Sequence, residues 1–244
     1  EFERGENSPT RILMQKMNAA AFDWHNYGKS TIGNRSDIER VPLPNLRAFY
    51  RKYYQPDNAL LIVAGQFDEE KALGYIAKHF GAIEKPTRKL PTTYTDEPAQ
   101  DGEKSITLRR VGSAAYAGVT YHIPSGAHPD FAAVDVLSYI LAIEPAGRLY
   151  KALVEPKIAS SITGGTYALH DPGMMLFYSQ AAEIENVEKV RDVMLAEIEK
   201  IGDEGVSDEE VERVLQQVAT QREKELADTT GLAVQLSNWA AQGD

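Results

Sequence analysis

The chain has 244 residues, a formal net charge of −10, 43% hydrophobic residues and no cysteine. The hydrophobic content excludes a disordered chain, and no apolar run approaches the ~18 residues needed to span a bilayer. The acidic balance, without blocks of Lys or Arg, argues against nucleic acid or an anionic membrane as the main partner, and the absence of Cys excludes disulfides, thiol nucleophiles and zinc fingers.

The two ends are untypical of a complete protein. The sequence begins at Glu1 without an initiator Met or a signal-peptide pattern, and it stops directly after an amphipathic run. We therefore expect a piece of a longer protein, truncated at both ends.

Helical periodicity dominates the first part of the chain. Ser8 followed by Pro9 marks a helix start, because the missing N–H of Pro is tolerated in the first turn. The continuously apolar run at 59–64 (ALLIVA) is typical of a strand covered on both faces. The spacing of apolar residues predicts helices at about 9–21, 36–39, 44–54 and 68–80.

The pattern changes after residues 84–104, a stretch rich in Pro, Thr and charged residues that is typical of a linker. Strands are predicted at 106–108 and 117–123, and at 158–169 and 174–182 around a hairpin-type turn. Helices are predicted at about 131–141, 148–154, 187–201, 207–227 and 232–239. Helices mixed with mostly hairpin-connected strands indicate an α+β fold.

The residues alone indicate no self-contained active site. Gly-rich phosphate loops and the G-x-S-x-G elbow are absent, and neither H-E-x-x-H nor H-x-x-E-H occurs among the five His. His79 is interpreted as a residue of a helix C-terminus, His128 as a residue at a helix start, His170 as a turn residue and His122 as a solvated strand residue. No catalytic residue is therefore assigned, and the substrate-binding residues stay unknown.

Several segments resemble the pitrilysin-type M16 zinc peptidases. EFERGENSPTRILMQKM and HNYGKSTIG precede NLRAFYRKYYQPDNALLIVAGQFD, which is similar to the family's helix-to-strand block "fYrkyY.P.N" and "vaG.fd". Further on, AGRLYKALVEPKIASSITGG resembles the family's "sRLy..L.e" segment. The matching residues are Tyr50, Tyr53, Tyr54, Pro56, Asn58, Gly65, Asp68, Arg148, Leu149, Tyr150 and Leu153.

The resemblance implies an M16 peptidase-like fold, a metalloenzyme α/β roll in which antiparallel-rich sheets are flanked by helices. Residues 1–90 would be the C-terminal part of a first M16 domain, 91–102 a linker, and 103–244 a second M16 domain truncated at its C-terminus. Family members close two halves over an unfolded peptide. The implied partners are therefore a peptide or unfolded polypeptide substrate and a second M16 half or subunit, with no nucleic acid and no membrane span.

The resemblance also implies a zinc site. In the family, H-x-x-E-H supplies two His ligands and a Glu general base, and a Glu further along the chain is the third ligand. In that register Glu1 is the third zinc ligand, leaving a fourth position for water. Alternatively, Glu1 is a terminal residue without a metal role. Residues 25–32 lie near the substrate cavity by analogy, or form only a polar turn.

The implied function is that of a zinc-dependent endopeptidase or oligopeptidase that hydrolyses peptide bonds in an enclosed chamber. Zinc is expected in the full-length parent, whereas this chain alone is expected to be inactive and without bound metal. The alternative is a non-catalytic M16-like half or subunit that binds peptide or scaffolds a catalytic partner. The compartment is left unknown, with the periplasm favoured over the cytoplasm because bacterial relatives are often exported.

Overall fold

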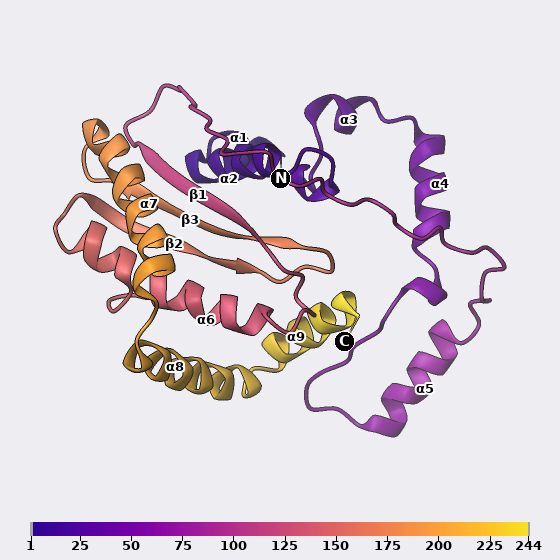
Figure 1. The fold of residues 1–244 in the computed structure, drawn as a ribbon. Coiled ribbons are helices and arrows are strands. Elements are labelled where there is room, and N and C mark those ends of the chain that lie inside the picture. Colours follow the sequence, from indigo (N-terminus) through magenta and orange to yellow (C-terminus); the bar gives the residue numbers. More distant parts are fainter. Residues whose placement is uncertain (1, 244) are drawn as a thin grey trace. The chain divides into compact units, whose positions relative to one another are not determined.

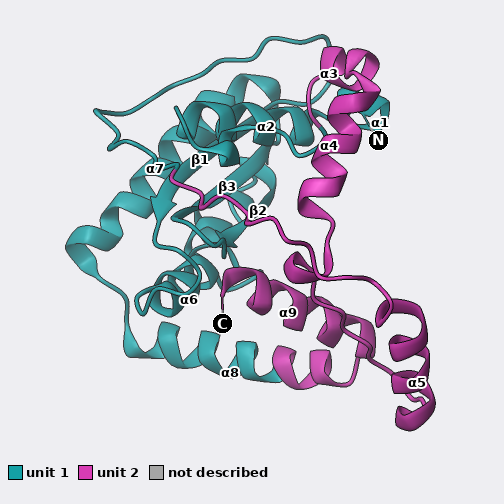
Figure 2. Cartoon of the chain, turned by 90° about the vertical axis from the view of Figure 1, so that its right-hand side faces the viewer, with its two compact units in different colours: residues 1–32, 95–220 teal, residues 33–94, 221–244 magenta. Residues whose placement is uncertain are grey.

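The structure, a computed structural model, describes residues 2–243, and the chain divides into two units. Residues 1–32 and 95–220 belong to the first unit, and residues 33–94 and 221–244 to the second (Figure 2). Each unit therefore joins segments that are far apart in the sequence. The assignment of 1–90 and 103–244 to two M16 domains stays a prediction.

The first unit contains a three-stranded antiparallel sheet with the order β1-β3-β2 (Figure 1). β1 (Tyr116–Ile123) and β2 (Ala159–Tyr167) pair with opposite edges of β3 (Gly173–Ala181). The central strand reads GMMLFYSQA, and seven of its nine residues are buried, as expected for a strand covered on both faces. The strands predicted at 117–123, 158–169 and 174–182 are thus confirmed, with ends that differ by one or two residues.

Helices cover both faces of this sheet because alternate side chains of a strand point to opposite sides. Val119 and Phe177 face a core formed with α6, η3 and α7, whereas Met174 faces the opposite way and packs against the end of α2. The helices of this unit are α1 (Phe2–Glu6), α2 (Pro9–Ala21), η1 (Asn26–Gly28), α6 (Phe131–Ala142), η3 (Tyr150–Val154), η4 (Ile184–Asn186), α7 (Val187–Glu204) and most of α8 (Asp208–Leu226). Residues from the start of the chain therefore cover a sheet formed by strands between residues 116 and 181.

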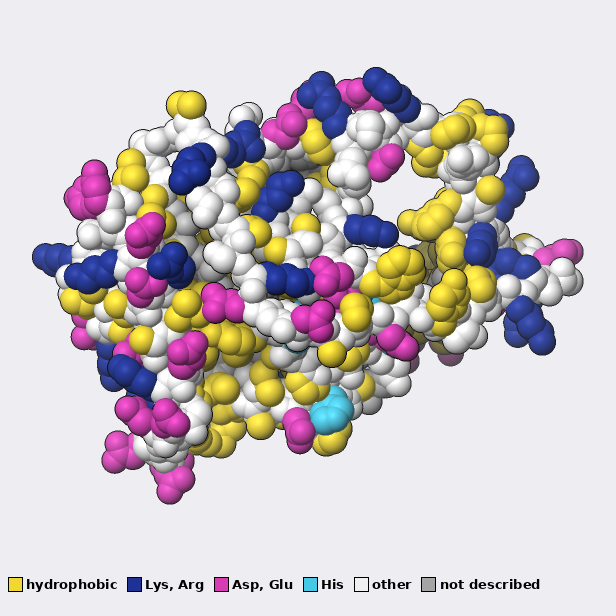
Figure 3. All heavy atoms as spheres, turned by 45° about the horizontal axis from the view of Figure 1, so that its top comes forward, with side chains coloured by type: hydrophobic (Ala, Val, Ile, Leu, Met, Phe, Trp, Pro, Cys, Tyr) yellow, Lys and Arg dark blue, Asp and Glu magenta, His cyan; other side chains and the backbone are white. Residues whose placement is uncertain are grey.

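The second unit consists of helices and extended segments without a buried residue among those described. Its elements are α3 (Arg35–Arg40), α4 (Leu43–Tyr53), η2 (Pro56–Asn58), α5 (Glu69–Phe80), the end of α8 and α9 (Thr229–Gln242). Figure 3 shows hydrophobic side chains gathered over α4, where Phe49 is 57% and Tyr50 61% exposed.

Two predicted strands are wrong for the part of the chain that the structure describes. Residues 59–64 and 106–108 form no strand, and Leu60 and Ile106 are exposed. Each sequence has the apolar pattern of a strand, but a strand forms only when its backbone pairs with another, and none of the described segments pairs with these two.

The other predicted elements are observed, which confirms the α+β fold class. The segment predicted as a helix at 148–154 is a short π-helix, η3. Among residues 2–243, no helix combines the length and hydropathy required to cross a membrane.

Candidate functional site

The predicted zinc ligand, Glu1, lies outside the described residues, but the segment after it is described. α1 begins at the next residue, and α2 is N-capped by Ser8, whose hydroxyl accepts a hydrogen bond from the Arg11 N–H at 3.4 Å. Arg110, on the extended segment before β1, donates to the Glu6 carbonyl at 3.5 Å. The helix start predicted at Ser8 and Pro9 is confirmed.

α2 is fixed to the sheet at close range. A Cβ at Gly118 of β1 would lie 2.7 Å from the Met17 sulfur, so the Met17 side chain of α2 packs directly on the strand at this glycine. At the end of α2, the His122 Nε2 lies 2.9 Å from the Ala21 carbonyl, and the imidazole stacks on Phe22 at 4.9 Å between ring centroids. His122 is exposed, as predicted, but it is a structural contact rather than a purely solvated residue.

A carboxylate from the predicted linker holds the turn that follows α2. Glu97 accepts hydrogen bonds from three consecutive backbone N–H groups, those of Asp23 (2.6 Å), Trp24 (3.0 Å) and His25 (2.8 Å). Burial raises the pKa of Glu97, but the three hydrogen bonds outweigh burial and leave the pKa below its usual value. Lys104 adds an ion pair with Asp23 at 2.7 Å.

The HNYG turn is held by a network around His25, whose side chain is only 8% exposed. Its Nδ1 accepts the Tyr27 N–H at 3.1 Å, so its proton is on Nε2, which donates to Asp171 at 3.2 Å. His170 contacts the other oxygen of Asp171 at 3.1 Å. Burial raises the pKa of Asp171, but the hydrogen bonds from His170 and His25 outweigh it and lower the pKa. Both ring nitrogens of His25 are occupied, which indicates a positioning role for the turn at 25–28.

The described residues do not provide a zinc site. Among residues 2–243, no group of three His, Cys, Asp or Glu is placed to hold a metal ion. His79 lies in the last turn of α5 as predicted, and His128 accepts the Asp130 N–H at 3.1 Å just before α6. We therefore assign no step of a zinc reaction to these residues.

The family-like RLY segment has a structural role. Arg148 donates two hydrogen bonds to the Glu210 carboxylate, both at 2.7 Å, and a third to the Gly205 carbonyl at 3.0 Å. Glu210 also accepts the Ser207 N–H at 2.9 Å, and the Ser207 hydroxyl accepts the Glu210 N–H at 3.3 Å, so the two residues form a capping box at the start of α8, the helix predicted at 207–227. The Arg148 hydrogen bond is the largest of the effects that lower the pKa of Glu210 from 4.5 to about 2.

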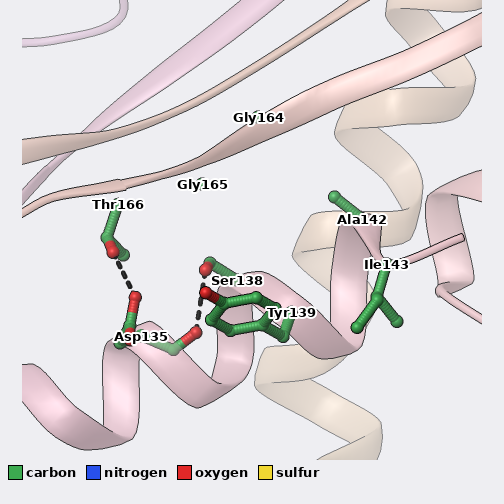
Figure 4. A pocket seen from close by; sticks show the side chains of 8 residues that line it. All are labelled: Asp135, Ser138, Tyr139, Ala142, Ile143, Gly164, Gly165 and Thr166. Atoms are coloured by element: carbon green, nitrogen blue, oxygen red, sulfur yellow. Dashed lines mark hydrogen bonds between the residues drawn. The ribbon is translucent and has the colours of Figure 1, made fainter. Parts of the chain in front are cut away.

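A cavity of about 340 Å³ lies between α6 and β2 (Figure 4). The Asp135 carboxylate accepts a short hydrogen bond from the Thr166 hydroxyl, and the Ser138 hydroxyl donates to the Asp135 carbonyl at 2.8 Å. The lining residues are Asp135, Ser138, Tyr139 and Ala142 of α6, Ile143 directly after this helix, and Gly164, Gly165 and Thr166 of β2.

Two adjacent glycines of β2 form the strand wall of this cavity, and a side chain would be unfavourable at each for a different reason. A Cβ at Gly164 would lie 2.2 Å from the Leu176 carbonyl oxygen and 2.5 Å from the Phe177 ring. Gly165 has φ +159°, at the edge of the region that favours glycine, and a Cβ there would meet nothing within 4 Å. Neither glycine adds a side chain to the strand wall, and Gly164 is the one that faces α6, because its partner Phe177 lies in the core on that side.

Neither the role of Glu97 nor this cavity was predicted from the sequence. Glu97 lies in a stretch without periodicity and more than 70 residues from the turn that it holds, so no local pattern marks it. The Gly-Gly pair inside a predicted strand was the one available signal, because glycine in a strand often marks a close approach of another group.

Comparisons with known proteins identify the family. A family model described as "Peptidase M16 inactive domain" matches residues 40–218. Zinc protease PqqE of Helicobacter pylori is 28% identical over 214 residues, which are 86% of this chain and 48% of PqqE, so the chain spans about half of that relative.

Two solved structures share the fold of this chain. A protease from Helicobacter pylori has a TM-score of 0.90 at 25% identity, covering 99% of this chain and 59% of that one. The periplasmic protease PqqL from Escherichia coli shares the fold, with a TM-score of 0.72 at 19% identity over 98% of this chain and 28% of its own. The chain belongs to the peptidase M16 family and contains its inactive domain.

Proposed function

We propose that this chain is the peptide-holding, non-catalytic part of a zinc-dependent M16 peptidase that hydrolyses peptide bonds in an enclosed chamber. The zinc protease name of the Helicobacter pylori relative supports the reaction class, and the description of the matched domain as inactive supports the assignment of this part. The zinc site would depend on an H-x-x-E-H motif elsewhere in the parent polypeptide, since the 244 residues contain none. A second M16 half or subunit is the proposed partner.

The observation that carries this proposal is the open edge of β2. β2 pairs with β3 on one side only, and no described segment pairs with its other side. Along such an edge, alternate backbone N–H and C=O groups point outward and accept an extended peptide as a further strand. The proposed occupant is therefore a peptide or an unfolded segment in the extended conformation.

We further propose Glu1 as the third zinc ligand in the parent. The support is the anchoring of the segment that follows it, because α2 is fixed to β1 and the turn after α2 is held by Glu97. α2 begins at Pro9, eight residues after Glu1, and an anchored scaffold that close to a ligand would reduce the ordering needed when the metal binds.

The zinc proposal is tested in the full-length parent with Glu1→Gln, and Glu3→Gln is the matched control because Glu3 is exposed on α1. Glu1→Gln should lower zinc affinity and peptide hydrolysis at least about 100-fold, since even residues that only orient a ligand contribute about 10–100-fold. Glu3→Gln should match the wild type in bound zinc and hydrolysis. Full zinc content in Glu1→Gln, or hydrolysis that survives a strong chelator, would contradict the proposal.

The second candidate is a non-catalytic M16 half or subunit in a parent without a zinc site. The description of the matched domain as inactive favours it. The upstream sequence of the parent separates the two: H-x-x-E-H with bound zinc supports the peptidase, and its absence supports the non-catalytic subunit. We propose the periplasm, favoured over the cytoplasm, as the compartment of the protein, and the support is the fold shared with a protease named as periplasmic.

A further inference from the structure

We propose that the cavity between α6 and β2 is a subsite that takes the basic side chain, Lys or Arg, of a peptide lying along the edge of β2. This inference rests on the proposed peptide binding and adds a preference for one class of side chain. It is carried by the arrangement of one acid, one aromatic ring and one bare strand wall around a cavity of about 340 Å³.

The acid is Asp135, the one charged side chain among the eight residues that line the cavity. The Thr166 hydroxyl donates to its Oδ1 and fixes its orientation, whereas Oδ2 has no hydrogen-bond partner in the described part of the chain. A carboxylate held in place with one open oxygen beside a cavity suits a cationic group, because charge-assisted hydrogen bonds are about twice as strong as neutral ones.

The rest of the cavity suits the aliphatic part of such a side chain. Asp135, Tyr139 and Ala142 lie four and three residues apart on α6 and therefore line one face of the helix, over about 10 Å at 1.5 Å per residue. Figure 4 shows Asp135 at one end of this row and Ala142 with Ile143 at the other. A Lys or Arg stem can pack along the Tyr139 ring while its charged end reaches the carboxylate.

The strand wall gives a peptide access to this row. Gly164 and Thr166 face α6, because their partners Phe177 and Met175 belong to the same core as Leu141 of α6. Gly164 adds no side chain between β2 and the row on α6, so a side chain of an added strand can reach that row. Side chains of a strand project alternately, so one side chain of the added strand would point toward α6. The chain's net charge of −10 also favours a cationic peptide over an anionic one.

The test measures the affinity of two fluorescein-labelled unstructured peptides for the full-length parent, with zinc removed so that neither is cut. One peptide carries a single Lys, and the other carries norleucine, which has the same stem without the charge. Fluorescence anisotropy of the wild type should give about tenfold tighter binding of the Lys peptide. N-methylation of alternate backbone amides should weaken both peptides, because it removes the donors that pair with β2.

Asp135→Asn should reduce the ratio of the two affinities to about one, because the amide keeps the shape and loses the charge. Asp130→Asn is the matched control: it removes the same charge just before α6, from an exposed residue whose side chain does not cap the helix. It should keep the preference for Lys.

Three results would overturn the subsite. The first is equal affinity of the wild type for the Lys and norleucine peptides. The others are a preference for Lys that Asp130→Asn and Asp135→Asn reduce equally, or one that Asp135→Asn leaves unchanged. A measurement without any protein variant checks the same point, since an acetyl-lysine peptide that binds the wild type as tightly as the Lys peptide refutes it. If the Lys peptide and the norleucine peptide bind the wild type with equal affinity, only the subsite proposal fails. If neither peptide binds, peptide binding itself fails, independently of the Glu1→Gln zinc measurement.

Discussion

The ion pair between Arg148 and Glu210 should contribute a large share of the stability of the first unit. It joins the segment before η3 to the start of α8, both side chains are only 20% exposed, and the guanidinium contacts both carboxylate oxygens at 2.7 Å. Glu210→Gln removes the charge, keeps the shape and leaves one oxygen that can still accept the Ser207 N–H.

The magnitude follows from the pKa of Glu210, which is lowered from 4.5 to about 2 in the folded protein. Each pKa unit corresponds to about 1.4 kcal/mol, so ionised Glu210 stabilises the fold by about 3 kcal/mol at pH 7. Because the folded-state pKa lies below the unfolded one, this contribution is fully present above the unfolded value and is lost as the pH falls toward about 2.

We therefore expect Glu210→Gln to lower the free energy of unfolding by about 2–3 kcal/mol at pH 7 and by less than half as much at about pH 3. Urea unfolding followed by circular dichroism at both pH values measures the difference. Glu209→Gln, at the exposed neighbouring position, should change stability by less than about 0.5 kcal/mol. The reasoning is refuted if Glu210→Gln matches Glu209→Gln at pH 7, or if its effect does not decrease with pH.

Two further predictions concern the packing around the sheet. Glu97→Gln should speed amide hydrogen exchange at 23–25 and lower the free energy of unfolding by about 1–3 kcal/mol, because the amide cannot accept all three N–H groups. Asp96→Asn, on the exposed neighbour, should leave the exchange unchanged, and equal exchange in both variants would contradict the clamp. Gly164→Ala should lower the free energy of unfolding by about 3 kcal/mol or more in urea unfolding, because its Cβ would lie 2.2 Å from the Leu176 carbonyl oxygen. Gly202→Ala, in open space on α7, should instead stabilise by up to about 1 kcal/mol, and similar results for both glycines would argue against the close contact.

The fold class and most elements of this chain could be predicted from local sequence pattern, because hydrophobic periodicity, helix caps and turns depend on residues that are close together in the sequence. The helix start at Ser8, the helix at 207–227 and the hairpin after β2 were predicted this way. The prediction of a strand at 59–64 was wrong because a strand also needs a neighbouring strand to pair with. The apolar pattern of a segment does not show whether such a neighbour is present.

The candidate site could be predicted only in small part, because its contacts join residues distant in the sequence. Glu97 and the turn at 23–25, or Asp135 and Thr166, meet only once the sheet and its helices are assembled. The role expected for Glu1 came from a resemblance rather than from physical pattern, and it stays a prediction. His122 illustrates the general difficulty: its exposure followed from strand alternation, but its bond to Ala21 did not.

The dependence of α2 on strands that come much later in the chain affects synthesis on the ribosome. β1 begins 95 residues after the end of α2, and β3 follows only at Gly173. At roughly 5–20 residues per second, α2 would wait roughly 5–20 s before its first sheet partner has been synthesised. During that interval the apolar face around Met17 and Phe22 lacks the strands that bury it in the folded protein. A nascent chain of this protein should therefore bind a chaperone that holds unfolded segments until the hairpin of β2 and β3 is complete.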